Sequence, residues 1–221
     1  RIMPTINVNR TGHIQGVGNS SFSTARTSNS GTVTDGVSGT KNVQFFDGRG
    51  TNRFSRVFLH FDTSGITGTL SAAHIDIDGG SSSPDPNDTI VIKSTAFGGD
   101  GGTALATSDM YSSLDYGTAY SSELTTWSTS NNEYTLTAAA LADIKNNDHF
   151  TVAIIDHDAD YSNTDTGSTS DVNVNFDVTI TLDYTLAATG YGDTVIGVAP
   201  ANIATVKGVA TANIETVIGV D

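Results

Sequence analysis

Alternating carboxylates at 156–160 are the strongest candidates for metal chemistry in the chain. The segment reads Asp-His-Asp-Ala-Asp and directly follows an apolar run. Carboxylates at a strand end can converge, and Ca²⁺ prefers six to eight hard oxygen ligands. An EF-hand loop is excluded, because Tyr161 stands where glycine is required and Gly167 where glutamate is required. Two alternatives stay open, a solvated acidic loop or a calcium site formed by Asp156, Asp158 and Asp160.

Four aromatic residues between 111 and 127 could bind a sugar. They lie among Ser, Thr and Gly, and an aromatic face can pack on the apolar face of a pyranose ring. Large aromatic side chains also fill cores and rims, which is the alternative reading. The candidate glycan-binding residues are Tyr111, Tyr116, Tyr120 and Trp127.

A histidine and two carboxylates share one face of a predicted strand at 73–78. His74, Asp76 and Asp78 alternate there with apolar residues. Two or three such groups can hold Zn²⁺, and His60 of another predicted strand is a further candidate ligand. The polar exterior of a sheet explains the same pattern without a metal.

The residues that could catalyse a reaction form no recognisable arrangement. A hydrolase needs an activated nucleophile or two opposed carboxylates. The chain has no cysteine, three scattered glutamates and no Gly-x-Ser-x-Gly segment. The glycine-rich loop at 98–102 lacks the Lys-Ser/Thr of a phosphate-binding loop. We therefore expect a protein that is not an enzyme.

The elements that position these residues are predicted to be strands. Ser and Thr make up 56 of the 221 residues, and Asp outnumbers Glu by 21 to three. This composition disfavours helices and favours turns. Strands are expected at 42–46, 54–62, 73–78, 89–95, 133–137 and 150–156, and the one expected helix spans 138–145 with Thr137 as its N-cap.

The clearest pattern is the alternation of apolar and polar residues from Val172 to Tyr184. It predicts one long, half-buried antiparallel strand whose even-numbered residues face the core. Residues 1–42 are weakly patterned, and we expect an opening strand and long loops there. Together these elements predict an all-β domain over 1–186, an antiparallel β-sandwich of jelly-roll type with one short helix.

Residues 187–221 contain an 11-residue repeat in which Val-x-Gly-Val occurs three times. The recurring glycine and Pro200 favour extended segments joined by turns. So few copies cannot bury their own apolar side. We therefore expect an extended assembly arm that packs on another subunit, the alternative being that it packs on its own domain. Its predicted contact residues are Val195, Val198, Ile203, Val206, Val209, Ile214, Val217 and Val220.

The overall charge restricts the partners. The formal net charge of −14 opposes binding to a phosphate backbone, so no nucleic-acid partner is expected. Apolar runs stay well below the roughly 18 residues that a membrane-spanning helix needs. We therefore expect no membrane partner either.

Two stretches resemble known families. Segments 54–66 and 70–77 resemble the signature of DNRLRE-type jelly-roll modules. That signature has an aromatic-apolar strand ending in Phe-Asp, a Ser-Gly-Ile turn and a second strand introduced by Ser-Ala. Those modules are extracellular β-sandwiches, and some of them bind carbohydrate.

The second resemblance covers 123–221 and includes the C-terminal Val-x-Gly-Val repeat. This succession is similar to virion structural proteins of tailed bacteriophages, especially marine ones, where such a sandwich precedes such a repeat. It implies a non-enzymatic structural component of a phage particle, as a capsid decoration, tail or fibre protein. The implied partners are other virion proteins and copies of the chain itself. The alternative is an extracellular carbohydrate-binding or adhesive module whose partner is a host surface glycan. The other segments that carry the resemblance are Trp127–Ser130, Leu136–Ile144, Asp156–Asn163 and Leu182–Leu186.

Overall fold

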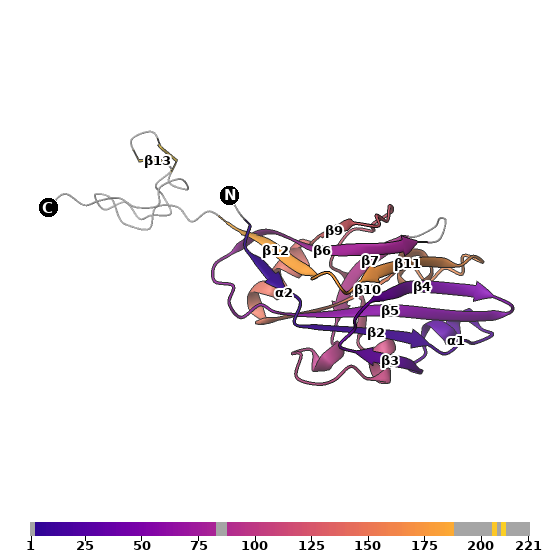
Figure 1. Ribbon diagram of the computed structural model, residues 1–221. Helices are drawn as coiled ribbons and strands as arrows, with labels where there is room; N and C mark the ends of the chain where they lie inside the picture. The colour runs from indigo at the N-terminus through magenta and orange to yellow at the C-terminus, as the bar shows by residue number, and fades with distance from the viewer. Residues whose placement is uncertain (1–2, 83–87, 188–204, 207–208, 211–221) are drawn as a thin grey trace. The chain divides into compact units, whose positions relative to one another are not determined.

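The chain divides into two compact units, Arg1–Thr185 and Leu186–Asp221. The computed structural model describes residues 3–82, 88–187, 205–206 and 209–210. The division lies one residue before the predicted boundary after Leu186. The first unit is an antiparallel β-sandwich, which confirms the predicted all-β fold (Figure 1).

Twelve strands of this unit form one hydrogen-bonded path that folds over itself. Their order is β1-β12-β6-β11-β4-β5-β10-β7-β8, with β2 joined to β5 and β3, and β9 joined to β6. The strands are β1 Thr5–Asn7, β2 Arg10–Gly16, β3 Gly31–Asp35, β4 Thr40–Gly48, β5 Thr51–Asp62, β6 Leu70–Ser82, β7 Thr89–Ser94, β8 Leu114–Ala119, β9 Asn131–Thr135, β10 His149–Asp156, β11 Ser170–Asn175 and β12 Thr181–Leu186.

Helical segments are short. The predicted helix is α2, Ala138–Asn146, and Thr137 caps it by accepting a hydrogen bond from the Ala140 N–H at 3.5 Å. The other helical segments are α1 Phe22–Arg26, η1 Ala96–Gly98, η2 Thr107–Met110 and η3 His157–Tyr161. Within the described residues, no helix is long and apolar enough to cross a membrane.

The expectation of mostly loops before residue 42 is wrong. β1, β2, α1 and β3 all lie there, and β2 pairs with both β5 and β3. The pattern of β2 is weak because small residues are needed where another segment packs on it. A Cβ at Gly12 would lie 2.5 Å from the Leu105 side chain and 3.0 Å from the Phe97 ring. α1 has only five residues, too few to show a helical period.

Strand β5, which includes the predicted strand 54–62, is buried on both faces. Val57 and Leu59 on one face and Arg56 and Phe58 on the other are all fully buried. A second apolar layer covers the latter face, because η1, η2 and the segment between them pack there. This layer encloses the charged side chain of Arg56.

The prediction of one strand from Val172 to Tyr184 is wrong. β11 ends at Asn175 and β12 begins at Thr181. Between them the chain turns, because the Asp177 carboxylate accepts from the Gly39 N–H at 2.8 Å while its own N–H donates to Asn175 Oδ1 at 3.1 Å. β11 lies between β4 and β6, whereas β12 lies between β6 and β1, so the chain crosses from one side of β6 to the other at this turn.

The alternating residues of this turn do not face the core. Phe176 is half-buried and Val178 is 44% exposed. Both line an open groove of about 510 Å³ together with residues 8–11 and 35–37. Ile180 and Leu182 are buried as predicted, because they follow the turn.

The second unit is described in one repeat only. β13, Thr205–Val206, pairs antiparallel with β14, Val209–Ala210, and Val206 lies opposite Val209. Extended pairing agrees with the prediction for this repeat. The other predicted assembly residues lie outside the described residues: Val195, Val198, Ile203, Ile214, Val217 and Val220.

Candidate functional site

A buried ion pair lies between β5 and η3. Arg56 Nε donates to Asp160 Oδ2 at 2.6 Å and Arg56 Nη2 donates to Asp160 Oδ1 at 2.8 Å. Neither side chain is exposed to solvent. Burial is the largest single influence on Arg56 and opposes its charge, but the charge and hydrogen bonds of Asp160, together with Tyr116 and Tyr111, raise the pKa of Arg56 overall. The guanidinium is therefore held in its charged form.

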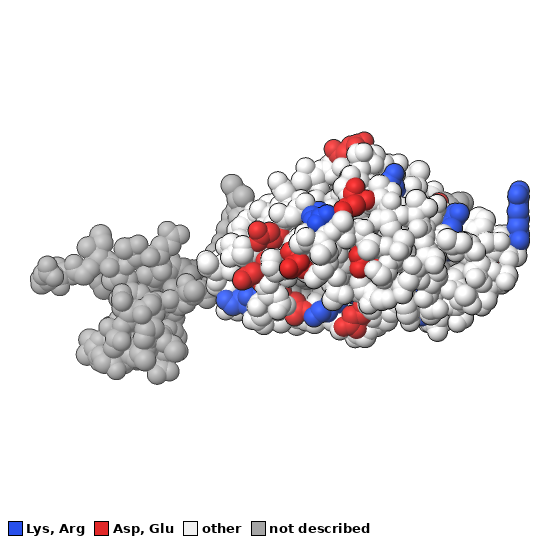
Figure 2. Space-filling model, turned by 90° about the horizontal axis from the view of Figure 1, so that it is seen from below, with Lys and Arg blue, Asp and Glu red and all other residues white. Residues whose placement is uncertain are grey.

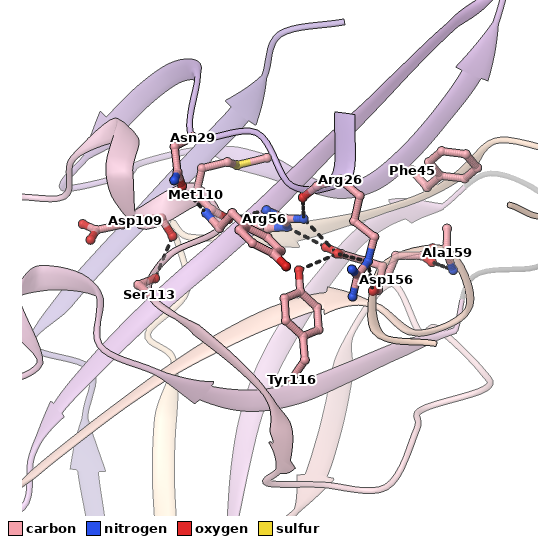
Figure 3. A network of polar contacts seen from close by, with 12 residues as sticks. Arg26, Asn29, Phe45, Arg56, Asp109, Met110, Ser113, Tyr116, Asp156 and Ala159 are labelled. Atoms are coloured by element: carbon pink, nitrogen blue, oxygen red, sulfur yellow. Dashed lines mark hydrogen bonds and ion pairs between the residues drawn. The ribbon is translucent and has the colours of Figure 1, made fainter. Parts of the chain in front are cut away.

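Other groups complete this Arg56–Asp160 network. Figure 3 shows Arg26, Arg56 and Tyr116 converging on one point. The Tyr116 hydroxyl donates to Asp160 Oδ1 at 2.7 Å, and Arg26 Nε donates to the Asp160 carbonyl oxygen at 2.6 Å. Arg56 also donates to the backbone carbonyl oxygens of Arg26 and Met110. Burial, and then the Asp160 carboxylate, raise the pKa of Tyr116. The network ties five separate segments together: α1, β5, η2, β8 and η3.

The three predicted calcium ligands do not form a ligand set in this structure. Both carboxylate oxygens of Asp160 bind Arg56, as described above. Asp156 caps η3, because its Oδ1 accepts from the Ala159 N–H at 2.6 Å. Asp158 instead lies beside His157, with 3.0 Å between its Oδ1 and the imidazole Nδ1. The three carboxylates alternate in the sequence, but they do not share one face, because the chain forms the short helix η3 after β10.

Asp156 has a protein partner on its second oxygen too, because the Ser170 hydroxyl donates to Oδ2. Asp156 is buried. Burial outweighs these hydrogen bonds and raises the pKa of Asp156 to about 6. This carboxyl group joins β10 to β11.

The four predicted sugar-binding rings do not form one surface. Tyr120 is buried, stacks on Phe150 at a centroid distance of 5.2 Å, and donates its hydroxyl hydrogen to Asp143. Tyr116 belongs to the Arg56–Asp160 network and has Arg26 over its ring at 4.2 Å. Tyr111 lies beside it, with ring centroids 5.7 Å apart. These three rings serve internal packing.

Trp127 lies elsewhere, against β6. A Cβ at Gly79 would lie 3.0 Å from the indole Nε1 and 1.9 Å from the Ser128 carbonyl oxygen. The indole nitrogen is buried and has no hydrogen-bond partner among the described residues. Gly79 therefore allows the 127–128 segment to pack closely on the sheet.

A histidine and three carboxylates meet on the outer face of β9, β6 and β12; we call them the His74 cluster. His74 Nε2 lies 3.3 Å from Asp76 Oδ2, 3.7 Å from Asp183 Oδ2 and 4.0 Å from Glu133 Oε2. His74 and Asp76 point outward because Ala73, Ile75 and Ile77, which alternate with them, fill the core. Desolvation by burial is the largest influence on Asp76, and its pKa is raised.

The cluster differs from the predicted zinc site in its members. Asp78 does not belong to it, and its carboxylate lies near the Asn175 amide at 3.4 Å. His60 lies on β5, where its ring nitrogen contacts the Thr151 hydroxyl at 2.8 Å. Glu133 and Asp183 take their places. Glu133 lies close to His74 because it is paired with Asp76 across β6 and β9. Asp183 lies close to His74 because β12 is the neighbour of β6 on its other side.

The charged surface and the comparisons give no further site. On the face in Figure 2, acidic and basic side chains of the described residues are interspersed rather than arranged as a basic stripe. No protein-family model matches the chain, and no curated protein matches its sequence. The function is therefore argued from the resemblance of the sequence and from the geometry above.

Proposed function

We propose that this protein is a non-enzymatic structural component of a bacteriophage particle. In this proposal the sandwich of residues 1–186 is a rigid body. Residues 187–221 bind other virion proteins or further copies of the chain. The resemblance over 123–221 supports the phage assignment, and the division of the chain into two units supports the separation of roles.

The observation that carries the proposal is the strand pair in the C-terminal repeat. Val206 lies opposite Val209 within one Thr-Val-x-Gly-Val-Ala segment. A hairpin with two residues in each strand is at best marginally stable alone in water. Thr-Val-x-Gly-Val occurs three times, at 194–198, 205–209 and 216–220. The described strand pair and the valines that recur in the sequence would gain stability by pairing with, or packing on, another chain.

The polar interior of the sandwich also suits a static role. In the Arg56–Asp160 network, the charged groups bind one another and backbone carbonyl oxygens. Such a network fixes one arrangement of the segments that it joins, at a high cost if any member is removed. A structural protein benefits from this rigidity.

The experiment is a quantitative count of the chain in purified particles of the phage that encodes it. We expect mass spectrometry to find the chain in a fixed ratio to the major capsid protein, in every preparation. Absence of the chain from purified particles, with the chain present in infected cells, would overturn the proposal.

A further inference from the structure

The His74 cluster is assembled by three neighbouring strands of the sandwich. His74 and Asp76 come from β6, Glu133 from β9 and Asp183 from β12. One ligand atom from each of His74, Asp76 and Asp183 lies within 4.8 Å of the others, and no other three such residues in the described part of the chain come together in this way. A sheet is a rigid support, so the arrangement does not depend on a loop.

Each carboxylate of the cluster has one oxygen fixed by a neighbouring side chain. Asn131 Nδ2 donates to Asp76 Oδ1 at 3.1 Å. The Thr135 hydroxyl donates to Glu133 Oε1 at 3.3 Å, and the Thr5 hydroxyl donates to Asp183 Oδ1. The other oxygen of each carboxylate is the one nearest to His74 Nε2, and that of Asp183 also accepts from the Thr181 hydroxyl at 3.3 Å. Hydrogen bonds that orient the outer oxygen of a ligand are typical of metal sites.

The charge of the cluster is unbalanced. Three carboxylates surround one imidazole, and within the described residues their only ion-pair partner is His74. His74 and Asp183 are mostly shielded from solvent, with side chains 18% and 16% exposed. Like charges this close repel one another, and either a cation between them or a proton shared by Asp76 and Asp183 relieves the repulsion.

We propose that His74, Asp76 and Asp183 bind one Zn²⁺ ion on the outer face of the sheet. One nitrogen and two oxygens supply three protein ligands and leave the fourth tetrahedral position to water or to Glu133, whereas Ca²⁺ requires six or more oxygens. Bonds of about 2.0–2.1 Å place tetrahedral ligands about 3.3 Å apart. The separations of 3.3 and 3.7 Å from His74 Nε2 are close to this value. Glu133 Oε2 lies farther away, 4.0 Å from His74 Nε2, on a side chain that is 53% exposed.

The test uses the full chain without a histidine tag. Calorimetric titration with zinc chloride should give one site per chain, and zinc should raise the melting temperature because it binds the folded state. His74→Asn should weaken zinc binding by about 100-fold, and Thr5→Val, which releases Asp183, by about tenfold. Calcium and magnesium chloride should give no comparable shift. Asp183→Asn serves as a second ligand variant if His74→Asn does not fold.

The matched control is His157→Asn. His157 also faces two carboxylates, with its Nδ1 2.9 Å from Glu123 Oε2 and 3.0 Å from Asp158 Oδ1, but these groups do not form a compact set of three. This variant should bind zinc as the natural chain does. The proposal is overturned if the natural chain binds no zinc, or if His74→Asn and Asp183→Asn bind it unchanged. Loss of binding in His157→Asn alone would overturn it as well.

Discussion

Arg56 and Asp160 meet in the interior of the sandwich as a two-point ion pair, with N–O distances of 2.6 and 2.8 Å and no solvent contact. Arg56 lies in the middle of β5 and Asp160 in η3, which follows β10. The pair therefore ties an irregular segment to the central strands. Its strength depends on both partners being present.

Removing one partner of this pair should be strongly destabilising. Asp160→Asn leaves the guanidinium buried without its counter-charge, and we expect a loss of about 3–5 kcal/mol in the free energy of unfolding. Urea unfolding measures this loss. The control is Asp35→Asn, because Asp35 pairs with Arg10 at 2.8 Å but both side chains are more than a quarter exposed. That change should cost about 1 kcal/mol or less. Equal losses in the two variants would contradict the importance of burial.

Asp156 should make stability depend on pH. Its pKa of about 6 in the folded chain exceeds the unfolded value of about 3.9. Between these values the folded state binds more protons, so this group's contribution to stability falls as pH rises from about 4 to about 6. Asp156→Asn removes the effect and can still accept from Ala159. We compare the free energy of unfolding of Asp156→Asn with that of the natural chain at each pH. The difference should favour the variant by about 2 kcal/mol more at about pH 7 than at about pH 4.

The pH dependence of Asp156 must be measured as a difference between Asp156→Asn and the natural chain, because His13 changes stability with pH in the opposite direction. Burial is the main cause that lowers the pKa of His13 to about 4. Between that value and its unfolded pKa of about 6.5, the unfolded state binds more protons, so His13 adds stability as pH rises. The two slopes oppose each other in the natural chain. A difference between Asp156→Asn and the natural chain that does not change with pH would contradict the prediction.

The turn between β11 and β12 makes two neighbouring positions respond differently. Leu182→Ala should cost about 2–5 kcal/mol, because Leu182 is fully buried. Val178→Ala should cost about 0.5 kcal/mol or less, because Val178 lies on the open turn. Chemical denaturation of both variants tests the prediction. Similar losses would restore the single-strand interpretation of 172–184.

Gly79 should tolerate no side chain. A Cβ there would lie 1.9 Å from the Ser128 carbonyl oxygen, and we expect Gly79→Ala to cost about 1–3 kcal/mol through overpacking. Gly65 is the control, because a Cβ there meets nothing within 4 Å. Gly65→Ala should leave the melting temperature unchanged or raise it slightly. A neutral Gly79→Ala variant would show that the segment around Trp127 moves freely.

Patterns confined to one segment predicted the fold well. The alternation of Ile75 and Ile77 with His74 and Asp76 located β6 and its outer face, and the Thr137 cap located α2. Such signals are local, because a strand period or a helix cap depends on residues a few positions apart. They carry no information on which distant segment covers a face.

The errors follow from that limit. The burial of Arg56 was not predicted, because η1, η2 and their connection pack on β5 and those residues have no period that indicates it. Asp183 joined His74 because β12 pairs beside β6. The Asp177–Gly39 hydrogen bond that breaks the long alternation also joins distant segments. The one available hint was Asn175-Phe-Asp177, since Asn and Asp favour turns.

The central claim is that residues 187–221 attach this protein to a particle while the sandwich folds without them. The most direct measurement compares the full chain with a chain ending at Leu186, by their incorporation into particles and their melting temperatures. We expect the shortened chain to keep the melting temperature of the sandwich and to be missing from purified particles. Normal incorporation of the shortened chain, or unfolding of its sandwich, would contradict the account.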